Sequence, residues 1–236
     1  MRVIGLVVVL GLLAACSSEG PTEDDGRMDL AFSFEEGTQD WTGDFVDFGL
    51  EMKEEDLELV FDLRALPEEV GGSGRALVLE GLNLSDDLFM FLKHQVTGLR
   101  VNTTYAVTFD LDLASNAPSG CAGIGGAPGE SVYLKVGVAR TEPKRVVVDD
   151  SFRLSVDKGN QSQDGANALV IGTIANGEPC TGEAPFRRIT RDNQATPFLF
   201  PTGSDGTLWL FVGTDSGFEG KTTLFYDAIR VLLEPR

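Results

Sequence analysis

The feature that most restricts the fold of this chain is a series of short stretches in which apolar residues alternate with polar or small ones. Alternation with a period of two places one face of an extended strand on a core and the other in solvent. Gly, Asn, Asp and Pro residues separate the stretches, as turns between strands require. The predicted strands are 30–34, 57–63, 76–82, 88–92, 105–113, 131–139, 152–156, 168–174, 207–212 and 222–233.

Helical patterns are weak by comparison. Beyond the N-terminal segment, no stretch offers a long amphipathic pattern with capping residues at its ends. Segment 56–66 fits either a helix or a strand, and we favour a strand. Many short strands with regular turns are typical of a sandwich, a jelly roll or a barrel. We therefore predict an all-β fold, a jelly-roll type β-sandwich, as a single domain over residues 30–236.

The N-terminus has the pattern of an export signal. Arg2 precedes an apolar run over residues 3–13, which has the length of a signal-peptide core but is short for a membrane-spanning helix. The run ends in Leu13-Ala14-Ala15-Cys16, which resembles a bacterial lipobox. That resemblance implies acylation of Cys16 after removal of residues 1–15. The alternative is an ordinary secretory signal in which the cysteine is incidental.

The lipobox also predicts where the protein resides. Residues 16–29 would be the acylated cysteine and a small, acidic, flexible tether, because they contain almost no apolar side chains. We expect a lipid-anchored protein of the bacterial cell envelope. Ser17 after Cys16 is compatible with sorting to the outer membrane in a Gram-negative host.

The charge balance limits the partners. The chain has 19 Lys and Arg residues against 37 Asp and Glu residues, a formal net charge of −18. This charge repels nucleic acid and anionic lipid, so we expect no nucleic-acid partner and a membrane contact that depends on the lipid at Cys16. Many surface carboxylates are compatible with solubility, with Ca²⁺ binding, or with both.

Two cysteines remain after Cys16. We predict that Cys121 and Cys180 form a disulfide, because exported proteins fold in an oxidising compartment; two free thiols are the alternative. The bond would join the glycine-rich loop 116–130 to the loop 174–185 at one rim of the sandwich. A zinc site is not expected, since the chain has no CxxC pair and one histidine.

The two ends of the domain carry the most specific pattern. The first strand runs through Phe34 and Glu35 into a glycine-containing turn and Trp41, and the last strand contains Tyr226-Asp227 followed by Ile229 and Val231. This pattern resembles the jelly-roll carbohydrate-binding modules and the galactose-binding-like domains, and the chain is also similar to a set of bacterial lipoproteins. The resemblance covers only these ends. It implies a jelly-roll fold and, more weakly, carbohydrate binding.

The same resemblance implies one structural Ca²⁺ near the neighbouring first and last strands. On a regular strand Asp227 is in phase with Phe225, Ile229 and Val231, so it would tend toward the core, where a carboxylate needs a partner. Glu35 or Glu36 with Asp227 would supply oxygen ligands for the ion. The alternative is that Asp227 caps a turn or accepts backbone hydrogen bonds.

Candidate ligand-binding residues lie in two places. The loop after the strand 207–212 contains Asp215, Phe218 and Glu219, which we expect to be exposed at a sheet end. Trp41 offers a further aromatic face. The alternatives are a hairpin connection with solubilising acids, and a tryptophan that closes the sandwich.

The sequence gives little support for catalysis. His94 is the sole histidine, which we expect at the surface, and no GxSxG nucleophile motif is present. No catalytic residue is therefore assigned. The leading hypothesis is a non-catalytic, lipid-anchored envelope binding protein, with carbohydrate as the ligand to test first. The alternatives are a polysaccharide-active hydrolase or lyase that uses paired carboxylates, and a structural subunit that binds envelope protein.

Overall fold

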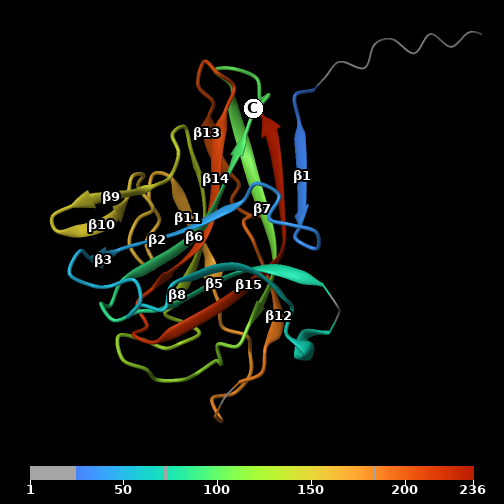
Figure 1. The fold of residues 1–236 in the computed structure, drawn as a ribbon. Helices are drawn as coiled ribbons and strands as arrows, with labels where there is room; N and C mark the ends of the chain where they lie inside the picture. Colours follow the sequence, from blue (N-terminus) through green and yellow to red (C-terminus); the bar gives the residue numbers. More distant parts are fainter. Residues whose placement is uncertain (1–24, 72–73, 183) are drawn as a thin grey trace, which may run out of the picture.

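The computed structural model describes residues 25–71, 74–182 and 184–236 (Figure 1). It confirms the jelly-roll type β-sandwich: two antiparallel sheets face each other, and a small third sheet lies to one side. The predicted signal peptide, Cys16 and most of the tether lie outside the described residues, so these assignments stay predictions. The described part contains no helix that is long and apolar enough to cross a membrane.

The first sheet has seven strands. Its main path is β12-β7-β15-β5-β4, with β1 paired to β15 and β13 paired to β7. The strands are β1 (Met28–Ser33), β4 (Val60–Ala65), β5 (Arg75–Leu82), β7 (Thr104–Ser115), β12 (Arg187–Asp192), β13 (Phe198–Pro201) and β15 (Lys221–Pro235). A 3₁₀ turn, η1 (Glu68–Val70), connects β4 and β5.

The second sheet has five strands in the order β11-β8-β14-β6-β2. They are β2 (Thr42–Val46), β6 (Leu88–Val96), β8 (Val132–Ala139), β11 (Ala168–Thr173) and β14 (Leu208–Ser216). The small sheet has the order β3-β10-β9, with β3 (Phe48–Gly49), β9 (Arg145–Val148) and β10 (Ser151–Leu154).

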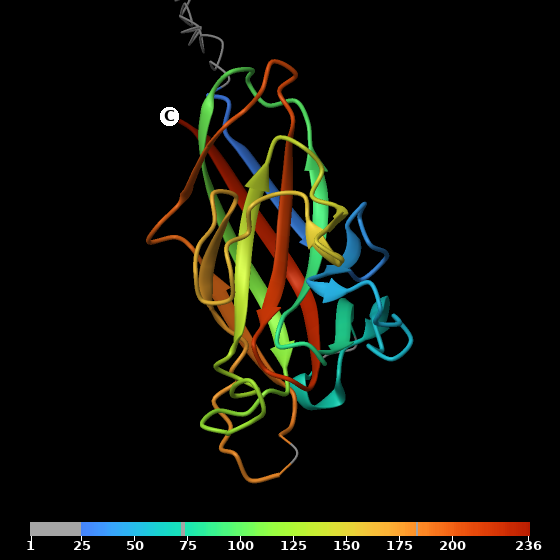
Figure 2. The same cartoon turned by 90° about the vertical axis from the view of Figure 1, so that its left-hand side faces the viewer.

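The alternation seen in the sequence separates the core from the outer faces. In β14, Leu208, Leu210 and Val212 enter the main core between the two large sheets. Phe211 points to the other face, where it joins a second apolar cluster. Leu154 at the end of β10, Val156 and Ala168 at the start of β11 pack on this outer face of the five-stranded sheet, which is turned toward the viewer in Figure 2. The face is therefore filled by the chain itself.

A bulge in β15 changes the expected position of Asp227. The pairing with β7 shifts between Tyr226 and Ala228, which leaves Asp227 as the extra residue. Ile229 enters the main core as predicted, but Phe225 lies in a cluster on the outer face of the sheet. The prediction that these residues share the core face was wrong, because one inserted residue reverses the phase of a strand.

The two ends of the sandwich differ. The start of β1 and the C-terminus lie at one end, whereas the glycine-rich loop 116–130 and the loop 174–185 lie at the other (Figures 1 and 2). The predicted disulfide between Cys121 and Cys180 is confirmed, with a Cα–Cα distance of 5.2 Å. The two loops therefore form one rim, remote from the point where the tether enters.

Candidate functional site

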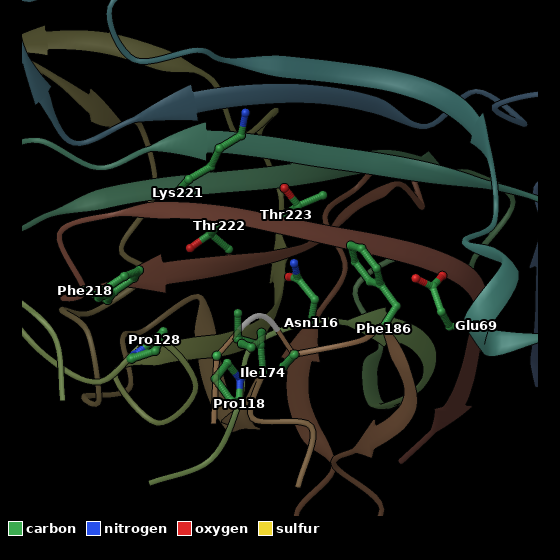
Figure 3. Close-up of a pocket in the computed structure, with 13 residues that line it drawn as sticks. Glu69, Asn116, Pro118, Pro128, Ile174, Phe186, Phe218, Lys221, Thr222 and Thr223 are labelled. Carbon is green, nitrogen blue, oxygen red and sulfur yellow. The ribbon is translucent and has the colours of Figure 1, made fainter. Parts of the chain in front are cut away.

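A cleft of about 690 Å³ opens at the rim that carries the disulfide (Figure 3). We call it the rim cleft. Its walls come from the two disulfide-linked loops, from η1 and from the start of β15. The lining residues used below are Glu69, Asn116, Phe186, Phe218, Lys221 and Thr223.

Backbone contacts fix the two loops beside the disulfide. Ser119 and Pro179 form a short parallel bridge, and the Ser119 N–H donates to the Glu178 carbonyl at 2.8 Å. The Gly177 N–H donates to Ser119 Oγ at 3.1 Å. These contacts hold the walls of the cleft before any ligand arrives, which lowers the entropic cost of binding.

Two phenylalanine rings lie on opposite sides of the cleft, with Asn116 between them (Figure 3). The Phe218 ring is held between Gly123 and Gly220, because a Cβ at either glycine would collide with it. Phe186 packs edge-on against Phe225 at a centroid distance of 5.2 Å. Both rings are half-buried, so each is fixed in place and still has surface to offer.

The polar groups of the cleft carry no free positive charge. Lys221 Nζ pairs with Glu58 at 2.8 Å and with Glu80 at 3.1 Å. The Thr223 hydroxyl donates to Glu80 at 2.9 Å. Glu69 is exposed at the edge. An anionic ligand would therefore meet carboxylates here without an available cation.

The four predicted ligand-binding residues do not come together. Phe218 lines the rim cleft, and the neighbouring Glu219 is half-buried, with its N–H bonded to the Ile124 carbonyl. Trp41 is 1% exposed and stacks on His94 at 5.2 Å, so it closes the sandwich. Asp215 is completely buried, which corrects the expectation that it is exposed.

Sequence reasoning missed several features of this region. Phe186 follows the second cysteine loop, and Asn116 begins the glycine-rich loop, but nothing in either segment marks a shared cleft. His94 was expected at the surface and is instead half-buried, with its ring packed against both Trp41 and Phe32. Burial lowers the pKa of His94, which favours its neutral form.

The predicted calcium ligands are also apart from one another. Asp227 forms an ion pair with Arg188, and Glu35 accepts a hydrogen bond from the Arg75 N–H at 3.3 Å. Among the described residues, the group whose carboxylate oxygens lie within 4.8 Å of one another is Asp47, Asp87 and Asp215. The structure does not bring Glu35, Glu36 and Asp227 together, and calcium binding by them stays a prediction.

The three aspartates belong to an ion cluster that we define as Asp47, Asp87, Asp215, Lys135, Lys158 and Arg153. Lys158 Nζ lies 2.7 Å from Asp215 and 2.9 Å from Asp47. Lys135 Nζ lies 3.0 Å from Asp215. Three acids thus face three bases in the cluster.

Arg153 completes the cluster from the solvent side, at 3.1 Å from Asp47 and 3.4 Å from Asp87. Burial, together with the Asp47 carboxylate, raises the pKa of Asp87 to about 7. A perturbed carboxyl group beside a hollow is a common sign of an active site. Here, however, the two adjoining hollows measure about 260 and 220 Å³. Asp47 and Asp215 are paired with lysines, so they are not free carboxylates facing each other across an open cleft.

Comparisons with known proteins find solved structures of similar fold. No protein-family model matches the sequence, and no curated protein matches it. Similar solved structures include xylanase modules from Clostridium thermocellum complexed with xylohexaose (13% identity, TM-score 0.39, covering 86% of this chain and 28% of that chain). Carbohydrate-binding modules described as promiscuous in their specificity share 14% identity with a TM-score of 0.41, over 84% of this chain and 59% of that chain. A carbohydrate-binding module described as specific for mannan shares 12% identity with a TM-score of 0.38, over 88% of this chain and 95% of that chain.

This chain covers 28% of the first of these structures and 59% of the second, less than two thirds of each. At 12–14% identity the likeness concerns the fold alone. A function therefore has to be argued from the geometry of the rim cleft.

Proposed function

We propose that the rim cleft binds a neutral carbohydrate and that the protein is a binding protein. The observation that carries this proposal is the pair of fixed phenylalanine rings, Phe186 and Phe218, on opposite sides of an open cleft with Asn116 between them. Aromatic rings pack against the apolar faces of sugar rings, and an amide can both donate to and accept from sugar hydroxyls.

The charge and the size of the cleft support the ligand class. Lys221 is neutralised by Glu58 and Glu80, so the lining offers hydrogen bonds without a net attraction for anions. The volume of about 690 Å³ lies within the range of small-molecule sites. A short neutral oligosaccharide fits these properties better than an acidic one.

Phe218→Ala is expected to weaken glycan binding by about tenfold, because the sugar loses one stacking surface. The measurement is a glycan array on residues 25–236, in Ca²⁺ and in EDTA, followed by titration of the best neutral glycan. The two buffers also test the predicted calcium ion. Phe186→Ala should have an effect of similar size.

Phe200→Ala is the matched control for these variants. Phe200 is also half-buried, but it lies on β13, away from the rim cleft. It should leave the dissociation constant unchanged. An array without neutral glycan hits on folded protein, or equal losses in all three variants, would refute carbohydrate binding in the rim cleft.

We further propose that a lipid on Cys16 anchors the domain to a bacterial membrane. The lipobox-like sequence supports this proposal. The described chain enters the sandwich at the end opposite to the rim cleft (Figures 1 and 2). With the anchor at that end, the rim cleft faces away from the membrane.

Cys16→Ser is expected to move the protein from the membrane fraction to the soluble fraction, because it removes the proposed acylation site. Fractionation of the expressing cells followed by immunoblotting measures the distribution. Ser17→Ala is the control and should leave the protein in the membrane fraction. An unchanged distribution of the Cys16→Ser protein would rule out the lipid anchor.

A further inference from the structure

The strand β9 is the open edge of the small sheet, whose order is β3-β10-β9. The β9–β10 hairpin projects from the side of the molecule (Figure 1). Val147 is 59% exposed and Val148 is 47% exposed. Leu50, 42% exposed, follows β3 on the other side of β10 and contacts the hairpin turn, where its N–H donates to the Asp150 carbonyl. The edge is thus apolar as well as unpaired in the described part of the chain.

The hydrogen-bond pattern shows which backbone groups are available. Asp149 and Asp150 form a two-residue turn, and both have positive φ angles, of 46° and 59°. Lys144 accepts a bond from Ser155 across the hairpin. Bonding alternates along an antiparallel pair, so the N–H and C=O of Val147 point away from β10. These groups are oriented to pair with another strand.

Edges of this kind are normally protected. Proteins place lysines, prolines or bulges on exposed edge strands, because an open edge pairs with other chains. β9 is short and begins with Arg145, but Asp44 and Glu54 hold that side chain, and the three residues that follow it are valines, Val146 to Val148. The chain has a formal net charge of −18, but no charged residue interrupts these three valines. This arrangement suits a partner strand.

The sequence around β9 complements itself. Residues 144–150 read Lys-Arg-Val-Val-Val-Asp-Asp. In an antiparallel pair of two copies centred on Val147, each Lys144 lies opposite Asp150 of the other copy. Each Arg145, which already pairs with Asp44 and Glu54 of its own chain, lies opposite Asp149. Opposite charges across an antiparallel pair stabilise it. The central Val147 pair is a hydrogen-bonded one, which agrees with the outward direction of its backbone groups.

We infer that β9 pairs with β9 of a second copy of this chain, in antiparallel register about Val147, which joins the two small sheets into one. The contact is small, so association is weak in solution and is favoured where copies are concentrated on a membrane. A dimer would carry two rim clefts and gain avidity for a repeating ligand. The inference itself does not depend on what the clefts bind.

Sedimentation velocity of residues 25–236 tests the pairing. These residues contain the whole sandwich and its core, and about 0.15 M salt screens the overall repulsion between copies. We expect the average mass to rise toward that of a dimer between about 10 µM and about 1 mM protein. Val147→Lys should raise the dissociation constant by at least about tenfold, because two lysines would then face each other at the axis.

Two further variants complete the test. Val101→Lys places the same charge at another exposed valine (53% exposed) and should leave association unchanged. Asp149→Asn with Asp150→Asn keeps the turn, since asparagine tolerates positive φ, and should weaken association by removing the charge pairs. A monomer at every concentration would overturn the inference. Association that Val147→Lys does not alter would also overturn it, since another surface would then be responsible.

Discussion

Asp215→Asn is expected to lower the free energy of unfolding by about 3–5 kcal/mol, because it leaves the buried Lys135 without its carboxylate partner. Asparagine has nearly the same shape as aspartate, so the loss reports charge and not packing. Lys135 and Asp215 are both completely buried, and their ion pair measures 3.0 Å. Water does not reach either group to compensate for the change.

The two lysines would respond differently. Lys158 would keep its ion pair with Asp47 at 2.9 Å. Lys135 would retain only the carbonyls of Lys158 and Gln163, at 2.8 and 2.9 Å. Burial already lowers the pKa of Lys135, and without Asp215 its ammonium group would lose its proton more readily. The cost of the substitution therefore arises mainly at Lys135.

Urea unfolding measures the loss of free energy, which is read from the shift in the midpoint when the m-values of the two proteins agree. Asp205→Asn is the matched control: Asp205 is exposed in a turn, so its replacement should change stability by less than about 0.5 kcal/mol. Adding Lys135→Met to Asp215→Asn should restore part of the loss, because it removes the unpaired ammonium. A loss below about 1 kcal/mol for Asp215→Asn would show that the ion cluster is not the buried network described here.

The strands that the sequence predicted are those with a clear apolar alternation. β8 alternates along its length, and β5 contains the apolar run from Ala76 to Leu79; both strands are largely buried. β12 was missed because it reads RRITRD and buries only Ile189. β13 was missed because it is four residues long and ends in Pro201. Such strands form because a longer neighbour, β7, supplies their hydrogen-bond partners. Their own side chains do not specify them.

The ion cluster could not be found from the sequence. The segment after Val212 contains glycine, threonine, aspartate and serine, which is typical of a loop. In the structure β14 continues to Ser216, because β6 and β8 pair with it on both sides. Asp215 therefore lies inside a sheet, and its partner Lys158 comes from a distant loop. Only the tertiary arrangement brings these charges together.

The rim cleft was predicted in part. The export signal implied an oxidising compartment, and from this we predicted the disulfide between Cys121 and Cys180. The disulfide in turn predicted that two loops meet at one rim of the sandwich. The sequence also identified Phe218 as an exposed aromatic. It could not identify Phe186 or Lys221 as neighbours, because their approach depends on how β12 and β15 lie in the same sheet. The disulfide was thus the informative feature, and its removal tests the whole region.

The variant Cys121→Ser with Cys180→Ser is expected to lower the free energy of unfolding by up to about 4 kcal/mol in the loop-closure treatment, for cysteines separated by 59 residues. The bond restricts the unfolded chain, and its loss increases the entropy of that state. The sandwich should still form, because the disulfide lies at the rim and the core lies between the sheets. Thermal and urea unfolding measure the loss, and circular dichroism checks that the strands remain.

The same variant should weaken ligand binding more than it disturbs the fold. The bridge between Ser119 and Pro179 and the bond from Ser119 to Glu178 would still join the loops, but without the covalent bond they open more readily. Asn116 and Phe186 would then be less fixed, which raises the cost of ordering the cleft. Thiol titration of the wild-type protein is the control and should find neither cysteine free. Unchanged stability would show that the disulfide does not restrain the chain, and unchanged glycan affinity would show that the binding site lies elsewhere.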